Sequence, residues 1–493
     1  MGFVAHNYSQ SDRFGDETAH MIGGHFILKG KIPYTDMQFN HQPLNYIFSA
    51  LVEKVSSPKN LYIYIARQRE AIFIYGAVWN ILYFVTFGPI ILLFSLIFEI
   101  SKYWYSGYKL LGETLAVYPT LYLIGIFIKI FLFKEKVSKI SLLLFSISTF
   151  TAMFSLLPLW PLILFLNIMM VYAFRKEWQK LICILFPFVI FSLFLFLYIS
   201  PTDFIKETII YNAKYFFPAS GEKPSLFGLF LLPFYSFIPP YTPSQLIITF
   251  FTFLFLFLTY FVIRIKRLTA WIGIMVILSL SNSRVANREF GSFHLLPWFA
   301  SLLFVTILTI YYLSIKKTKM SQWYMGKIFY LTIIIVIVFI YFFTPNALRE
   351  KKDVITENYI NYSYSETYGR AIKILKDPND RLAAIPNDTV VHWVADIDIA
   401  TRILEYYDWV YTIPAYRSEI MNTFANKPPE FVIDTGLRKN SVIDNYIMAI
   451  LKKDYTQLNH LGKPSNLYLH NRKYALITLN QWEQLSLMLY TKP

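Results

Sequence analysis

GDETAH at residues 15–20, GKIPYTD at residues 30–36 and HQPL at residues 41–44 concentrate acids, histidines and turn residues ahead of a long series of apolar segments. The pair Asp16 and Glu17 is the most informative feature, because a carboxylate close to hydrocarbon is costly unless it is paired or ligated. An acidic pair beside an apolar helix bundle therefore indicates a functional site at the boundary between membrane and water.

The composition is that of a polytopic membrane protein with an attached polar domain. Of the 493 residues, 55% are hydrophobic and only 16% are charged, whereas soluble domains carry about a quarter charged residues. The single cysteine, Cys183, excludes an intramolecular disulfide framework and a thiolate metal cluster. The net charge of +15 does not indicate a nucleic-acid partner, because the basic residues lie between apolar segments and set membrane topology.

Ten apolar segments are predicted to span the membrane. They are residues 73–98, 108–119, 120–133, 140–157, 160–174, 181–199, 244–263, 269–282, 293–315 and 328–345. Several are shorter than the roughly 20 residues that a perpendicular helix needs. Pro119 and the pair Pro158 and Pro161 predict tight turns between successive spans.

Basic clusters between these segments predict the orientation. They are Lys102/Lys109, Lys134/Lys136/Lys139, Arg175/Lys176/Lys180, Arg264/Lys266/Arg267 and Lys316/Lys317/Lys319/Lys327. With ten spans every cluster falls on one face, which the positive-inside rule makes cytoplasmic. The acidic segment, the loops 200–243 and 283–292 and the C-terminal domain then share the opposite face. Residues 1–15 contain no apolar run, so we expect a first span ahead of them, which would make eleven.

The 200–243 segment carries a ten-residue apolar run at 226–235, bounded by prolines. That length suits a re-entrant or interfacial helix. A hydrophobic lid buried on the bundle is the alternative.

Residues 346–493 read as a small α/β domain. Residues 389–394 and 430–434 are predicted strands. Predicted helices are 363–376, 396–407, 416–426, 440–453 and 478–490. We therefore divide the chain into a catalytic loop with interfacial helices (1–70), a transmembrane bundle (71–345) and an extracytoplasmic α/β domain (346–493).

The three motifs of residues 15–44, in this order, resemble the first external loop of GT-C glycosyltransferases that use polyprenyl-phosphate-linked sugars. Protein O-mannosyltransferases and the lipid A aminoarabinose transferase are members of that superfamily. There an Asp-Glu pair opens the loop, a Gly-x-x-Pro-Tyr-x-Asp stretch follows, and a Lys/His-x-Pro-Leu element leads into an amphipathic helix. The resemblance implies a GT-C-like fold, and the helix after Pro43 would lie in the membrane interface.

The resemblance makes Asp16 the general base that takes the acceptor's proton. Glu17 would orient Asp16, pair a cation or help to bind a metal. The alternative is that both carboxylates cap a helix over residues 18–29, since acids favour helix N-termini. The cofactor is left open, because nothing in the sequence requires a divalent metal.

Histidines follow the acidic pair. His20 and His25 are five residues apart, which does not place them on one helical face as a zinc pair. His41 stands where relatives carry a polar residue near the donor phosphate, and an imidazole could serve there. A solvated loop histidine is the alternative. Asp36, after the Pro-Tyr turn, is predicted to be structural.

A second basic site comprises Arg284, Arg288, Glu289 and His294. Arginine binds phosphate oxygens in a bidentate manner, and HLLP at 294–297 resembles a histidine-containing element of the relatives. Arg288 and His294 would therefore bind the leaving phosphate, or else anchor the chain at the interface. The D-x-D of Asp396 and Asp398 is predicted to cap a helix.

These observations predict a membrane glycosyltransferase that moves a sugar from a polyprenyl-phosphate donor to an extracytoplasmic glycolipid, polysaccharide or protein. The composition, rich in Ile, Lys and Asn, is typical of an AT-rich bacterium, so we expect location in a bacterial plasma membrane. A transporter or flippase for lipid-linked glycans is the main alternative. It would need a polar path through spans in which only Glu99 and Glu113, at span ends, are acidic. A non-catalytic receptor is the third reading.

Overall fold

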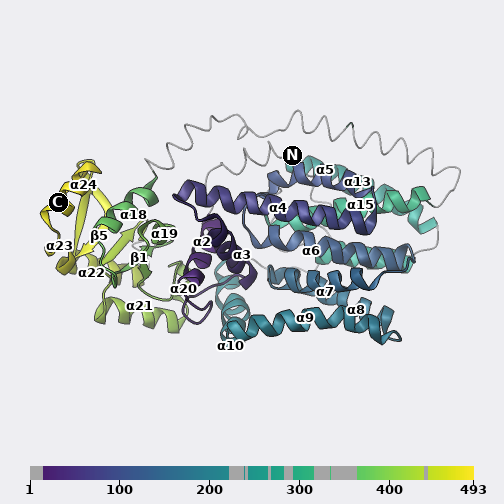
Figure 1. Ribbon diagram of the computed structural model, residues 1–493, viewed down its shortest axis with the longest axis horizontal. Coiled ribbons are helices and arrows are strands. Elements are labelled where there is room, and N and C mark those ends of the chain that lie inside the picture. The colour runs from purple at the N-terminus through teal and green to yellow at the C-terminus, as the bar shows by residue number, and fades with distance from the viewer. Residues whose placement is uncertain are drawn as a thin grey trace.

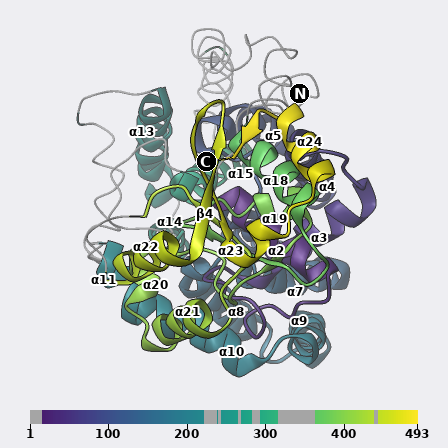
Figure 2. The same cartoon turned by 90° about the vertical axis from the view of Figure 1, so that its left-hand side faces the viewer.

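The computed structural model describes residues 15–220, 243–264, 268–281, 293–315, 363–437 and 442–492, together with residues 238 and 334. A bundle of long helices occupies one end of the molecule and a mixed α/β domain the other (Figure 1). Helices α2 (Gly15–Leu28) and α3 (Pro43–Ser56) lie between them. Viewed along the long axis, the α/β domain stands in front of the bundle (Figure 2).

Apolar helices that run along one common direction build the bundle. They are α4 (Leu61–Phe87), α5 (Ile91–Ser101), α6 (Gly112–Phe127), α7 (Lys139–Met153), α8 (Trp160–Phe174), α9 (Trp178–Tyr198), α13 (Pro243–Arg264), α14 (Leu268–Leu280) and α15 (Leu296–Ile315). In the described part of the chain, five helical segments are long and apolar enough to cross a membrane. Buried residues make up 83% of an 18-residue stretch of Gly112–Leu132, which contains α6, and 94% of one of Phe293–Tyr311, which contains most of α15, but 11% of one in α9. Helices α6 and α15 are therefore central, and α9 is peripheral.

The predicted span 73–98 is two helices. Helix α4 already begins at Leu61 and ends at Phe87; its C-cap residue, Gly88, has a positive φ of 86° and is followed by Pro89. Helix α5 then runs back along α4. Residues 61–70, assigned to the catalytic loop by sequence, form the first turns of α4. The segment 328–345 lies outside the described residues, apart from residue 334.

The predicted turn at Pro119 is wrong, because the predicted spans 108–119 and 120–133 share one helical segment, Gly112–Leu132. Helix α6 runs through Pro119 and continues as a π-helix over Ile128–Leu132. A proline inside a helix leaves the carbonyl four residues earlier without its N–H partner. Here the Tyr75 hydroxyl donates to that carbonyl, Leu115 O, over 2.7 Å. A neighbouring helix thus replaces the lost bond. The turn predicted at Pro158 is confirmed between α7 and α8.

The single-face arrangement of basic clusters is wrong for Lys102 and Lys109. The α6–α7 and α8–α9 connections share one end of the bundle, where Lys139 donates to Gln179 Oε1 over 2.9 Å. Lys109 lies at the other end, because the next residue, Leu110, donates its N–H to Glu17 of α2 over 3.3 Å. The cause is the division of 73–98 into two helices and the fusion of 108–133 into one. The clusters at Lys266 and Lys316 lie outside the described residues.

The C-terminal domain is a six-stranded mixed sheet in the order β2-β1-β3-β5-β4-β6. The strands are β1 (Arg381–Ile385), β2 (Asp398–Ile399), β3 (Phe431–Asp434), β4 (Tyr455–His460), β5 (Lys463–His470) and β6 (Tyr490–Thr491). The first three are parallel and the others antiparallel. Helices α18 (Tyr364–Leu375), α21 (Pro414–Asn426), α22 (Val442–Asp454) and α24 (Leu479–Leu487) confirm four of the five predicted helices, and β3 confirms one predicted strand.

Two predictions in this domain are wrong. The predicted strand 389–394 is mostly helix α19 (Val391–Ala395), and the predicted helix 396–407 contains β2 and irregular backbone. Valines 390, 391 and 394 favour a strand by propensity, but tertiary packing overrides it. Trp393 stacks on Tyr64 of α4 at a ring-centroid distance of 4.8 Å. Asp396, in a left-handed conformation with φ 51°, then ends α19.

Candidate active site

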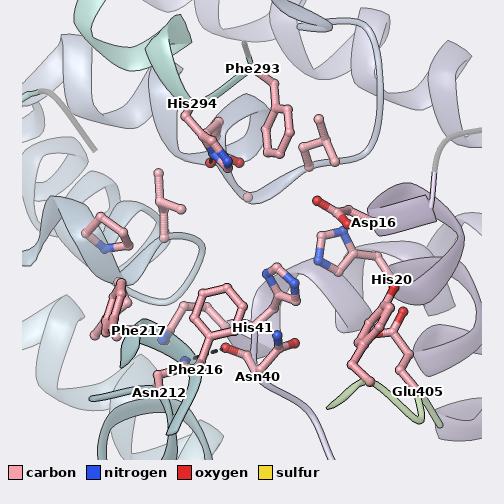
Figure 3. A pocket seen from close by; sticks show the side chains of 18 of the residues that line it. Asp16, His20, Asn40, His41, Asn212, Phe216, Phe217, Phe293, His294 and Glu405 are labelled. Atoms are coloured by element: carbon pink, nitrogen blue, oxygen red, sulfur yellow. Dashed lines mark hydrogen bonds and ion pairs between the residues drawn. The ribbon is translucent and has the colours of Figure 1, made fainter. Parts of the chain in front are cut away.

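A cavity of about 470 Å³ lies where the bundle, the α2–α3 segment and the C-terminal domain meet. Three of the sequence-predicted site residues, Asp16, His41 and His294, line it together. Figure 3 shows Asp16 and His20 on one side, His294 and Phe293 on another, and Asn212, Phe216 and Phe217 on a third, with His41 between them. Arg288, Arg284 and Glu289 lie outside the described residues.

The 30–36 turn places His41. The Asp36 carboxylate accepts the Ile32 N–H over 2.8 Å and closes the turn, as the structural reading of Asp36 predicts. Tyr34, fully buried with a φ of 68°, donates its hydroxyl to the His41 carbonyl over 2.8 Å. The Pro-Tyr turn therefore fixes the backbone that carries His41 to the cavity.

Glu17 turns away from the cavity that Asp16 lines. Both carboxylates lie in the first turn of α2, as the helix-cap reading predicts. Arg69 of α4 donates to Glu17 through Nε over 2.9 Å and through a terminal nitrogen over 2.6 Å. Both side chains are almost fully buried. Of the three roles predicted for Glu17, the structure shows the pairing of a cation.

One ring nitrogen of His20 forms a hydrogen bond, and the other forms none with the described residues. Its Nδ1 donates to the Leu110 carbonyl over 2.9 Å, so Nε2 is the unprotonated nitrogen of the neutral ring. Burial, with the neighbouring His41 as second cause, lowers the pKa of His20 to about 4. Its Nε2 is buried without a hydrogen-bond partner among the described residues. His25, by contrast, bonds Glu53 over 2.8 Å and lies outside the cavity lining.

His294 is held by an acid from the start of α6. Its Nδ1 lies 2.7 Å from Glu113 Oε1, and both residues are buried and line the cavity. The Glu113 carboxylate therefore orients the imidazole. By its sequence position Glu113 was only an acid at a span end, although an acid in the first turn of an apolar helix is itself a signal of function.

The C-terminal domain contributes Glu405, Tyr407, Asp408 and Trp409 to the cavity wall. Burial, with the Asp16 carboxylate as second cause, raises the pKa of Glu405 to about 8. A carboxyl with a raised pKa thus lies beside a second acid in the same cavity, and perturbed acids in a cavity are typical of sites where a proton is transferred. Glu405 could not be found from the sequence, because its stretch carries no motif and was predicted to be part of a helix.

Ionic contacts hold the C-terminal domain against the rest of the chain. Arg402 pairs with Glu419 over 3.0 Å and lies 3.7 Å from Glu207, whose carboxylate also accepts the Tyr416 hydroxyl. Burial raises the pKa of Glu207 to about 7. These contacts fix the segment that carries Glu405.

The D-x-D motif belongs to the same junction. Asp396 pairs with Lys29 over 2.5 Å, and Asp398 pairs with Lys31 over 2.8 Å. The prediction that these acids begin and cap a helix is wrong, because strand β2 follows; Asp396 is instead the C-cap residue of α19. They join the C-terminal domain to the α2–α3 connection.

Within the described residues, no group of three or more His, Cys, Asp and Glu side chains is arranged to hold a metal ion. Comparisons with protein-family models, with curated proteins and with solved structures found no match to this chain.

Proposed function

We propose that this protein is a membrane glycosyltransferase of GT-C type with ten to eleven transmembrane helices. It would transfer a sugar from a polyprenyl-phosphate donor to a glycolipid, polysaccharide or protein outside the cytoplasm. The observation that carries the proposal is the gathering of Asp16, His41 and His294 around one cavity at the end of an apolar bundle. Residues from distant parts of the chain meet there, as an acid–base site requires.

In this proposal Asp16 removes the proton from the acceptor hydroxyl, and His41, His294 and Arg288 bind the phosphate that departs. Glu113 keeps the His294 ring in place. Asp16 and His294 lie on different sides of one cavity, which allows the acceptor and the leaving group to approach the sugar from different directions.

The position of the cavity suits a lipid-linked donor. Helix α3 borders it through Gln42, which precedes the helix, and exposes Leu51 and Val55 (60% and 78%). Apolar side chains exposed on a short helix suit the membrane interface. The lipid tail would stay in the membrane while the sugar enters the cavity.

A transporter of lipid-linked glycans is the rival. The described core of the bundle is a large apolar cluster that extends from Trp79 to Ile310, which favours a site at the end of the bundle over a path through it. A transfer assay separates the two functions. Full-length protein in liposomes receives a panel of polyprenyl-phosphate sugars with an envelope extract as acceptor. We expect sugar transfer from one donor, and movement of intact donors without transfer would favour the transporter.

A topology experiment checks the orientation. In a Cys183→Ala background, cysteine replaces Lys136, at the far end of the bundle, or Lys463, in the C-terminal domain; both positions are exposed. We expect an impermeant thiol reagent to label the Lys463 position from outside intact cells, and the Lys136 position only after lysis. Labelling of both positions from the same side would contradict the proposal that the cavity lies outside the cytoplasm.

Glu405 predicts a pH dependence. With a pKa of about 8, its carboxyl is neutral below that pH and charged above it. A second negative charge beside Asp16 would then repel the donor phosphate. We expect the transfer rate to fall as the pH rises through about 8, and Glu405→Gln, neutral at every pH, to lack that decrease. If the transfer rate of Glu405→Gln falls in the same way, the pH dependence belongs to another titratable group.

A further inference from the structure

Four buried side chains in the cavity wall have polar atoms without a hydrogen-bond partner among the described residues. The atoms are His20 Nε2, both amide atoms of Gln42, Ser155 Oγ and Asn212 Oδ1. The four side chains are 1–8% exposed. A buried polar atom without a partner costs about 1–3 kcal/mol, and native proteins pair the great majority of such atoms. Each atom has almost no accessible surface, so a ligand in the cavity would reach it after a small rotation of its side chain, and four such side chains around one cavity favour a polar ligand there.

We propose that Gln42, Ser155, Asn212 and His20 form a subsite that binds the hydroxyl groups of a neutral sugar ring. The inference rests on the proposed function for its choice of a sugar, and it adds which side chains hold the ring and which charge the ring carries.

The surrounding bonds fix the hydrogen-bonding role of each atom. Asn212 donates its amide nitrogen to the carbonyls of Asn40 (2.9 Å) and Thr208 (2.8 Å). Its Oδ1 is therefore an acceptor. His20 Nε2 is also an acceptor, because Nδ1 carries the proton that bonds Leu110 O. Gln42 offers one donor group and one acceptor, and the Ser155 hydroxyl can do both.

This mixture selects hydroxyl groups over ions. A phosphate or carboxylate only accepts hydrogen bonds, so it would leave His20 Nε2 and Asn212 Oδ1 unsatisfied. An ammonium group only donates, so it would leave the Gln42 amide hydrogens unsatisfied. A hydroxyl group donates and accepts at once. A ring with several free hydroxyls is therefore the chemical class that satisfies all four side chains, and because none of the four is charged, a charged substituent placed against them would lose its hydration without gaining a counter-ion.

The local structure leaves these groups available. Gln42 is the N-cap residue of α3, yet its side chain makes no capping bond. Ser155 follows α7 and packs against the start of α6, and Gly112 permits that approach, since a Cβ at Gly112 would lie 2.7 Å from the Ser155 carbonyl oxygen. Phe216 and Trp409, whose ring centroids are 5.5 Å apart, line the same cavity and offer an apolar surface to the C–H face of a ring. The volume of about 470 Å³ lies in the range of small-ligand sites.

The test measures binding without turnover. The full chain in detergent is mixed with four free sugars in turn, namely a neutral hexose, a neutral pentose, an aminohexose and a hexuronic acid. Binding is detected by saturation transfer from protein to ligand. We expect a neutral sugar to bind more strongly than the charged ones, and Asp16→Asn to retain that binding. Each lost hydrogen bond should weaken binding up to about tenfold, so Gln42→Leu combined with Ser155→Ala should abolish the signal.

A matched control removes a buried hydroxyl elsewhere. Thr252 of α13 is 2% exposed, has an unpartnered Oγ1 among the described residues and does not line the cavity. Thr252→Val should keep the signal, and the thermal unfolding midpoint of all variants should match or exceed that of the wild type. The proposal is overturned if no neutral sugar binds, if a charged sugar binds better, or if Gln42→Leu with Ser155→Ala binds as the wild type does. Sugar binding without transfer from any lipid donor would uphold the subsite and reject the proposed function.

Discussion

Asp16→Asn should lower sugar transfer by about 10²–10⁴-fold, the usual contribution of a positioned general base. Asparagine keeps the size of the side chain and the ability to cap α2, but it cannot accept the acceptor's proton. The first turn of α2 should therefore remain intact, and loss of transfer would reflect chemistry. The measurement is the transfer rate at saturating donor, with donor affinity determined separately.

Asp454→Asn makes the same change outside the cavity lining and should leave transfer unchanged. Near-normal transfer by a folded Asp16→Asn protein would leave Asp16 as a helix-capping residue. Asp408, another carboxyl in the cavity wall, would then be the base to test.

Glu17→Ala should destabilise the fold by about 3–5 kcal/mol. It leaves the Arg69 guanidinium buried at 1% exposure without its carboxylate partner, and an uncompensated buried charge is among the largest single-residue penalties. Thermal or denaturant-induced unfolding of the protein in detergent measures this loss of stability. The double variant Glu17→Leu with Arg69→Met should recover most of the loss, since apolar side chains can replace a buried ion pair.

These variants distinguish the role of Glu17 from that of Asp16. If Glu17→Ala folds with wild-type stability and loses transfer, then Glu17 takes part in the reaction as the sequence first suggested. If it loses stability and the double variant transfers sugar, its role is to hold α2 against α4.

The sequence allowed much of the fold to be predicted where local signals were strong. Apolar runs located most helices, and Pro158 marked a real turn. Pro119 misled because the Tyr75 hydroxyl of another helix replaces the lost backbone bond, which no local pattern reveals. Val391 and Val394 led to the wrong prediction of a strand, because packing against α2, α4 and α18 overrides strand propensity.

The candidate site was predicted in part. The motifs of residues 15–44 and the histidine before α15 pointed to Asp16, His41 and His294, which the fold brings to one cavity. Glu405 and Asn212 come from segments without a motif, and only the tertiary structure shows that they face the same space. Glu17 could not be separated from Asp16 by sequence, because its partner, Arg69, is 52 residues away.

The central claim is tested most directly by following one labelled donor through reconstituted protein. Lipid phosphate without sugar and the sugar-bearing product are quantified together. The account predicts equal amounts of both from a neutral-sugar donor with wild-type protein, and neither above background with Asp16→Asn. Donor that reaches the opposite leaflet with its sugar still attached, in wild type and variant alike, would contradict it.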